Sequence, residues 1–158
     1  MNTCNPIDDS TTMTPTNTCH SQKETSAEGV IHNQIPGNRI LIVDDEKDIA
    51  KFFKFGLEHD GFTVDVFNDP VLALSNYEPG RYDLLLLDIR MPSMNGFELY
   101  QKIKDVDNKP KVCFTTAFEE YQNEFKKSFP SLHIDCFIKK PVELHNLIKI
   151  IRSRLYNS

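Results

Sequence analysis

Short apolar runs that alternate with amphipathic stretches are the feature of this sequence that most constrains its fold. The run Ile40 to Val43 is continuous and mostly β-branched, which is typical of a strand buried on both faces of a sheet. Similar patterns predict strands at 62–67, 84–87, 112–114 and 134–138. Helically spaced apolar residues, including Phe52, predict a helix before Gly61. Further helices are expected from Asp69, a candidate N-cap, and at about 96–104, 118–129 and 142–155.

Strands that alternate with helices in this way predict an α/β fold. The expected architecture is a parallel sheet with helices on both faces and right-handed crossovers. In such folds the ligand site lies at the carboxyl ends of the strands, beside the switch point. Polar side chains follow four of the predicted strands at that edge: Asp44 and Asp45, Asp88, Thr116, and Lys140. We therefore expect them to converge on one site.

The composition changes near residue 39 and predicts two parts. Residues 1–38 are rich in Thr, Ser and Asn with few large apolar side chains, so we expect a disordered polar tail. Residues 39–158 are predicted to form one folded domain. The formal net charge of -5 argues against a strongly nucleic-acid-binding domain. No apolar run approaches the ~20 residues of a membrane span, and no signal-peptide pattern opens the chain, so we expect a cytoplasmic protein without membrane insertion.

The four cysteines predict no disulfide framework. Cys4, Cys19, Cys113 and Cys136 form no C-x-x-C pair, and the last two lie in apolar, strand-like runs. We expect reduced thiols, either buried or in the tail.

The three aspartates of the expected site predict a metal ion. Like charges at close range require a proton or a neutralising cation. Oxygen ligands with room for water suit Mg²⁺, or Mn²⁺ in its place. We expect the cation to be held mainly by Asp45 and Asp88, with Asp44 acting through water.

Four segments together resemble the signature of receiver domains from bacterial and archaeal response regulators. They are V-D-D-E (43–46), L-L-D-I-R-M-P-S-M-N-G (86–96), F-T-T-A (114–117) and F-I-K-K-P (137–141). The resemblance covers residues 39 to about 156. It implies a flavodoxin-like, doubly wound sheet of five parallel strands in the order 2-1-3-4-5.

The resemblance also implies a two-component phosphorelay function for the site residues. Asp88 would be the phosphoacceptor, taking a phosphoryl group from the phosphohistidine of a sensor histidine kinase or a phosphotransfer protein. Thr116 and Lys140 would contact that group, and the main-chain carbonyl of Arg90 would be a further metal ligand. Thr116 and Phe137 would form a switch that changes the face made by the fourth helix, fifth strand and last helix. Such a domain assists its own phosphorylation and dephosphorylation and is not otherwise an enzyme.

Two further side chains are predicted to control the phosphate lifetime. Arg90 follows the acceptor by two residues and Phe118 follows Thr116 by two residues. Both should border the approach of the hydrolytic water, so we expect slow self-dephosphorylation. Because the sequence ends at Ser158, we expect a single-domain regulator that acts on an unknown protein target without binding nucleic acid directly. A phosphorylation-dependent homodimer is compatible with this.

Three other classes of protein share parts of this pattern. A pseudo-receiver would act as a protein-interaction module without phosphorylation, although it usually lacks one of the acidic or lysine positions. A haloacid-dehalogenase-type phosphatase needs a second acid two residues after its nucleophile, where this chain has Arg90. A flavodoxin-like electron carrier needs a phosphate-binding loop after the first strand, where Asp44 and Asp45 would repel the flavin phosphate.

Overall fold

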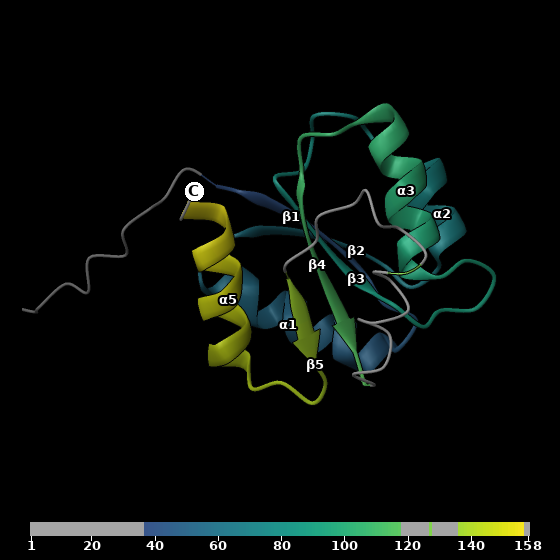
Figure 1. Cartoon of the computed structure of the whole chain (residues 1–158). Helices are drawn as coiled ribbons and strands as arrows, with labels where there is room; N and C mark the ends of the chain where they lie inside the picture. The colour runs from purple at the N-terminus through teal and green to yellow at the C-terminus, as the bar shows by residue number, and fades with distance from the viewer. Residues whose placement is uncertain (1–36, 118–126, 128–135, 157–158) are drawn as a thin grey trace, which may run out of the picture. The chain divides into compact units, whose positions relative to one another are not determined.

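The computed structural model describes residues 37–117, 127 and 136–156 (Figure 1). Within these residues, five parallel strands form one sheet in the order β2-β1-β3-β4-β5, which confirms the predicted doubly wound α/β fold. The strands are β1 (Arg39–Val43), β2 (Thr63–Phe67), β3 (Leu84–Asp88), β4 (Lys111–Thr116) and β5 (Phe137–Lys139). The helices are α1 (Lys47–His59), α2 (Pro70–Ser75), α3 (Gly96–Val106) and α5 (Leu144–Tyr156). The predicted tail up to residue 36 and the helix predicted at 118–129, apart from residue 127, lie outside the described residues.

The sheet is covered on both faces, with α1 and α5 on one side and α2 and α3 on the other (Figure 1). The alternation of side chains along β1 explains this arrangement. Ile40 and Ile42 pack in the same apolar cluster as Phe53 and Leu147 of α1 and α5. Leu41 and Val43 pack in a second cluster on the other face. Burying a large aliphatic side chain stabilises the fold by about 1.5–3 kcal/mol, so these strands anchor the domain.

Two helix starts are fixed by side-chain caps. The carboxylate of Asp69 accepts hydrogen bonds from the backbone N–H groups of Val71 and Leu72, at 2.7 and 3.2 Å, which confirms the predicted N-cap. At the start of α3, Asn95 and Glu98 form a reciprocal capping box. That box fixes the end of the loop that follows Asp88.

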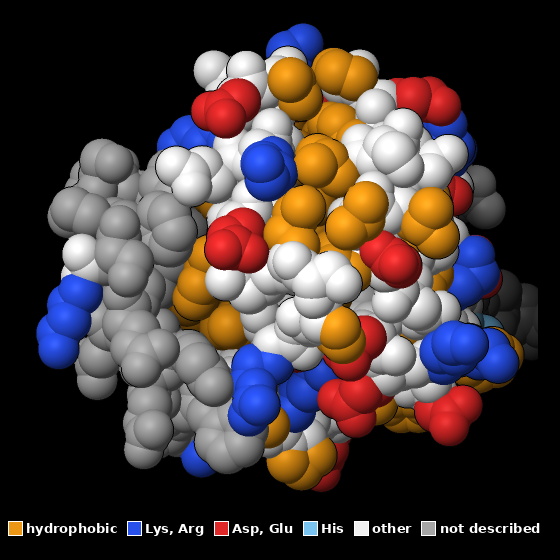
Figure 2. All heavy atoms as spheres, turned by 90° about the vertical axis from the view of Figure 1, so that its right-hand side faces the viewer, with side chains coloured by type: hydrophobic (Ala, Val, Ile, Leu, Met, Phe, Trp, Pro, Cys, Tyr) orange, Lys and Arg blue, Asp and Glu red, His pale blue; other side chains and the backbone are white. Residues whose placement is uncertain are grey.

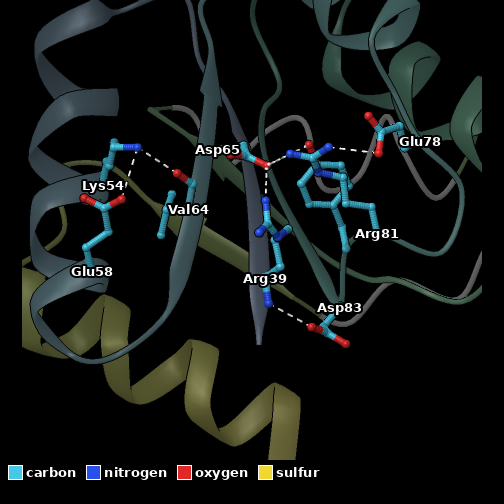
Figure 3. A network of polar contacts seen from close by, with 9 residues as sticks. Arg39, Lys54, Glu58, Val64, Asp65, Glu78, Arg81 and Asp83 are labelled. Atoms are coloured by element: carbon cyan, nitrogen blue, oxygen red, sulfur yellow. Dashed lines mark hydrogen bonds and ion pairs between the residues drawn. The ribbon is translucent and has the colours of Figure 1, made fainter. Parts of the chain in front are cut away.

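Edge strand β2 is tied to its neighbours by a polar network (Figure 3). The ammonium of Lys54 on α1 donates to the carbonyl of Val64 at 2.7 Å. Asp65 of β2 pairs with Arg39 at 3.1 Å and with Arg81 at 3.3 Å. Charged side chains along an edge strand discourage pairing with another chain.

Several apolar side chains remain exposed. Figure 2 faces the side of α2 and α3, where hydrophobic side chains gather with acidic and basic ones around them. Val71 and Leu72 of α2 and Val106 of α3 are exposed. Phe52 was predicted with the apolar face of its helix, but it is 50% exposed, because the buried face of α1 runs through Phe53 and its neighbours at helical spacing. No helix within the described ranges has the length and apolarity that crossing a bilayer requires.

Several predicted boundaries differ from the structure by one or more residues, most clearly at the fifth strand and the last helix. The fifth strand was expected at 134–138, whereas β5 covers Phe137–Lys139, and the last helix begins at Leu144 instead of about Val142. The apolar residues up to Ile138 predicted the strand from the sequence. Its bounds are set by the pairing with β4, which begins at Phe114 and Phe137.

The expectation of reduced thiols is wrong for Cys113 and Cys136, which form a disulfide with Cα atoms 4.6 Å apart. Phe114 pairs with Phe137 in the β4–β5 register, so the preceding residues, Cys113 and Cys136, also lie opposite each other. The two cysteines are 23 positions apart in sequence, so local spacing could not reveal the pair. Cys4 and Cys19 lie outside the described residues.

Candidate functional site

The carboxyl ends of the strands bring the predicted polar residues to one edge of the sheet. A hollow of about 280 Å³ opens there. It is lined by Asp45, Glu46, Asp88, Arg90, Thr116, Ala117 and Lys140. Asp44 lies beside it and is buried. The structure therefore gathers the polar ends of β1, β3 and β4 and the residue after β5, as the topology predicts.

Three carboxylates form the acidic part of the site. One oxygen each from Asp44, Asp45 and Asp88 lies within 4.8 Å of the other two. Asp44 and Asp88 are buried, whereas Asp45 is half-buried and faces the hollow. A set made only of oxygen donors, open to water on one side, fits a hard divalent cation such as Mg²⁺.

Lys140 provides a buried positive charge in the site. Its ammonium donates to Asp44 at 2.7 Å and contacts Asp88 at 3.1 Å and Glu46 at 3.2 Å. Burial by itself would lower the pKa of this lysine, but its hydrogen bonds and the charges of Asp44 and Asp88 raise the pKa instead. Lys140 therefore stays protonated and offsets part of the repulsion among the carboxylates.

The electrostatics of the site favour added positive charge. Burial raises the pKa of Asp88 to about 6; Lys140 opposes this rise, and the charges of Asp44 and Asp45 add to it. Burial also raises the pKa of Asp44, against the effect of Lys140. Asp88 is thus mainly ionised at pH 7, in a setting where its charge is incompletely compensated.

The loop after Asp88 is shaped by backbone contacts. The N–H of Ile89 donates to the carbonyl of Thr115 at 3.0 Å, and the N–H of Gly96 donates back to the carbonyl of Ile89 at 3.1 Å. A Cβ at Gly96 would collide with the main-chain carbonyl of Asp88, so the loop closes this tightly only with glycine there. Arg90, whose main-chain carbonyl was predicted as a metal ligand, lies in this loop and lines the hollow.

The predicted switch residues lie on neighbouring strands. The N–H of Lys140 donates to the carbonyl of Thr116 at 2.8 Å, which links the residue after β5 to the end of β4. Phe137 is half-buried, with its ring stacked on Phe114 at 5.8 Å and edge-on to Phe97 at 6.5 Å. Phe118 lies outside the described residues.

Sequence reasoning did not assign roles to two residues that contact the site. Glu46 pairs with Lys140, and Asn68 donates from its side chain to the carbonyl of Asp44 at 2.7 Å. Asn68 follows β2, whose carboxyl end lies at the same edge of the sheet, so the rule that located the aspartates could also have located Asn68.

A family model described as the response regulator receiver domain matches residues 40–152. The chain belongs to this receiver family. It is 33% identical over 116 residues to response regulator ArlR of Staphylococcus epidermidis strain ATCC 12228, covering 73% of this chain and 52% of ArlR. The ArlR of Staphylococcus aureus strain Mu50 is 32% identical over 117 residues, covering 74% and 52%. This chain thus spans about half the length of these curated relatives.

Solved receiver structures resemble the domain closely in fold. A CheY-like receiver domain protein from Methanospirillum hungatei is 29% identical, with a TM-score of 0.64 and coverage of 75% of this chain and 94% of that one. TrrA from Thermotoga maritima, solved in complex with Mg(2+)-BeF, is 28% identical, with a TM-score of 0.64 and coverage of 73% and 97%. The domain is therefore a response regulator receiver of a two-component system.

Proposed function

We propose that this receiver accepts a phosphoryl group on Asp88 from the phosphohistidine of a sensor histidine kinase or a phosphotransfer protein in the cytoplasm. The observation that carries the proposal is the convergence of three carboxylates and one buried lysine in a single hollow at the carboxyl edge of the sheet. The presence of all three acidic positions and of the lysine supports this proposal over a pseudo-receiver without phosphorylation, which usually lacks one of them.

In the proposed transfer, Asp88 is the nucleophile. A carboxylate oxygen attacks phosphorus, an O–P bond forms, and the P–N bond to the imidazole breaks with its electron pair moving to the ring nitrogen. Lys140 stands 3.1 Å from Asp88, close enough to move onto a phosphoryl oxygen. Thr116 lines the same hollow and donates its hydroxyl to the group on Asp88. Phosphoryl transfer depends mainly on such positioning and charge compensation. The domain is a phosphoacceptor that assists its own reactions, without a separate substrate to turn over.

We further propose that Asp45 and Asp88 hold a Mg²⁺ or Mn²⁺ ion, with Asp44 acting through water and the main-chain carbonyl of Arg90 contributing. The all-oxygen donor set and the raised pKa of Asp88 support this assignment. The Mg(2+)-BeF complex of the similar TrrA also supports it. Bound there, the cation supplies charge that neutralises the phosphoryl oxygens.

The signal leaves the site, in this proposal, through Thr116 and Phe137. Movement of Thr116 toward the phosphoryl group frees space toward which the Phe137 ring turns. The ring leaves its contacts with Phe114 and Phe97 and changes the face formed by β5, α5 and the segment at 118–129. A downstream protein, or a second copy of the chain, would bind the altered face.

Labelling with acetyl phosphate tests the function. The chain is incubated with labelled acetyl phosphate and Mg²⁺, and the phosphoryl content per chain is measured. Wild type should take up one group, and Asp88→Asn none. Asp105→Asn is the matched control, because Asp105 is exposed on α3 away from the strand ends, and it should label like wild type. Equal labelling of Asp88→Asn and wild type would refute the acceptor assignment.

A further inference from the structure

A disulfide lies a few residues from the switch positions of the proposed function. Cys113 of β4 precedes Thr116 by three positions, and Cys136 immediately precedes Phe137. Both sulfur-bearing side chains are buried, Cys113 fully and Cys136 with 4% of its surface exposed. We propose that Cys113 and Cys136 are a reversible redox-modification site, whose oxidation by a small-molecule disulfide ties β4 to β5 two positions before Thr115, the residue of β4 that pairs with Asp88.

The pairing of β4 with β5 is short, so a disulfide between these strands should strengthen their association. Among the described residues, β5 lies at the end of the sheet and its register with β4 contains only three residue pairs. The disulfide adds a covalent link directly before the first of these pairs, Phe114 with Phe137. A short strand at a sheet edge opens more readily than a central one, and the cross-link acts on β5, the shortest of the described strands.

The surroundings accommodate both oxidation states. Cys113 and Cys136 belong to the apolar cluster between the sheet and the α1 and α5 helices, with Ile138 and Ile151. A free cysteine thiol behaves as a small hydrophobic side chain, so reduction leaves two groups that this core can also hold. Disulfides in cytoplasmic proteins are usually transient or redox-sensing. In the cytoplasm, where the receiver is proposed to act, a reversible disulfide is therefore favoured over a permanent structural one.

The exchange chemistry follows from the burial of the two sulfurs. In oxidation, the Cys136 thiolate, the slightly exposed partner, attacks a small-molecule disulfide such as oxidised glutathione and releases one thiolate. The Cys113 thiolate then attacks the Cys136 sulfur of the mixed disulfide and releases the second thiolate. Two protein thiols are oxidised and one disulfide is reduced to two thiols. A small-molecule dithiol reverses both steps.

The expected consequence concerns Phe137, and this step rests on the proposed function. The cross-link holds the Cα atom of Cys136 4.6 Å from that of Cys113, so the backbone of the following residue, Phe137, is held against β4. The ring can still turn, but strand β5 can no longer move away from Phe114 with it. The oxidised domain therefore keeps the Phe137 backbone in place, whereas the reduced domain allows β5 to shift with the switch.

The first experiment measures the cross-link itself. The full chain carrying Cys4→Ser and Cys19→Ser is equilibrated at several ratios of oxidised to reduced glutathione. Free thiols are then blocked, and the digest is analysed by mass spectrometry. A cross-linked peptide pair containing Cys113 and Cys136 should form at oxidising ratios and disappear when dithiothreitol is added to the native protein. Absence of this peptide pair at every ratio, or its persistence under native reduction, would overturn the proposal.

The second experiment compares oxidised and reduced forms of the same chain. Oxidation should raise the melting temperature by roughly 10 °C and slow amide hydrogen exchange in Phe137–Lys139. Cys113→Ala and Cys136→Ala should each abolish the difference between oxidising and reducing buffer. The comparison of the oxidised and reduced forms of the chain with both cysteines does not depend on how well either alanine variant folds. Identical exchange of β5 in both forms would overturn the coupling to the switch. Asp88→Asn should show the same redox response, so this result is independent of phosphorylation.

Discussion

Lys140 and Asp44 form a buried ion pair at 2.7 Å, shorter than the contacts of Lys140 with Asp88 and Glu46. The ammonium thus lies against the carboxylate that was predicted to contact the metal only through water, more closely than against the proposed acceptor. For Lys140 to meet a phosphoryl group on Asp88, its pairing with Asp44 has to loosen. A divalent cation held by the aspartates, as proposed, would make that exchange easier, because it would add positive charge beside them.

Removal of Lys140 should expose the repulsion among the three carboxylates. Removing one partner of a buried ion pair typically lowers the free energy of unfolding by about 3–5 kcal/mol. We expect Lys140→Ala to lose about 3 kcal/mol of unfolding free energy in chelator-treated buffer, and Mg²⁺ to restore part of the loss. Urea denaturation with and without Mg²⁺ measures both effects. The exposed neighbour provides the control, since Lys139→Ala should change stability little. Equal effects of the two substitutions would contradict the role given to Lys140.

Asp88→Asn should stabilise the metal-free domain at pH 7. The pKa of Asp88 is about 6 when folded and near 3.8 when unfolded, so the folded state retains a proton that the unfolded state loses. The charged carboxylate therefore destabilises the fold above pH 6, and this penalty fades as the pH falls toward 4. We expect a gain of about 1–3 kcal/mol at pH 7 that shrinks at pH 5, measured by denaturation. A gain in unfolding free energy that does not depend on pH, or a loss at pH 7, would show that the charged Asp88 carboxylate does not destabilise the fold.

The two aspartates that follow β1 should differ in their effect on Mg²⁺ binding. Asp45 faces the hollow, whereas Asp44 is buried against Lys140. A direct ligand outweighs one that acts through water, so Asp45→Ala should weaken binding by roughly tenfold or more, and Asp44→Ala by less. Calorimetric titration gives the affinities, with Asp48→Ala on the exposed surface of α1 as control. Unaltered affinity in both site variants would refute the proposed ligand set.

The sequence revealed most of the architecture because the strands are short apolar runs with polar ends. The run Ile40–Val43 predicted a buried strand. The parallel topology alone predicted that Asp88 and Thr116 lie at the carboxyl edge of the sheet. The roles of Thr116, Phe137 and Arg90 came from family resemblance and stay predictions. The Cys113–Cys136 disulfide could not be predicted, because the register of β4 with β5 is a tertiary property that no local spacing encodes. The apolar pattern of α1 also did not predict which of Phe52 and Phe53 is buried, and in the structure Phe53 occupies the buried face while Phe52 is exposed.

The lifetime of the aspartyl phosphate should depend on the side chains at positions 90 and 118. Arg90 is exposed and lines the hollow, where it can pair with a phosphoryl oxygen and cover it. We expect Arg90→Asn and Phe118→Glu each to accelerate hydrolysis roughly tenfold or more, because water would gain access or be oriented. Decay of the labelled protein after removal of acetyl phosphate gives the rates. Lys102→Asn on α3 should decay like wild type. Unchanged lifetimes in both test variants would exclude these side chains as gates.

Asp88 is proposed to carry the phosphoryl group, and chemical mapping of the acyl phosphate identifies the modified residue. Borohydride reduces an acyl phosphate to an alcohol, so phosphorylated aspartate becomes homoserine. The phosphorylated chain is treated with borohydride and digested, and its peptides are sequenced by mass spectrometry. Homoserine should appear at position 88 in a Mg²⁺-dependent manner and be absent when acetyl phosphate is omitted. Homoserine at Asp44, Asp45 or another carboxylate, with Asp88 intact, would show that Asp88 is not the phosphoacceptor.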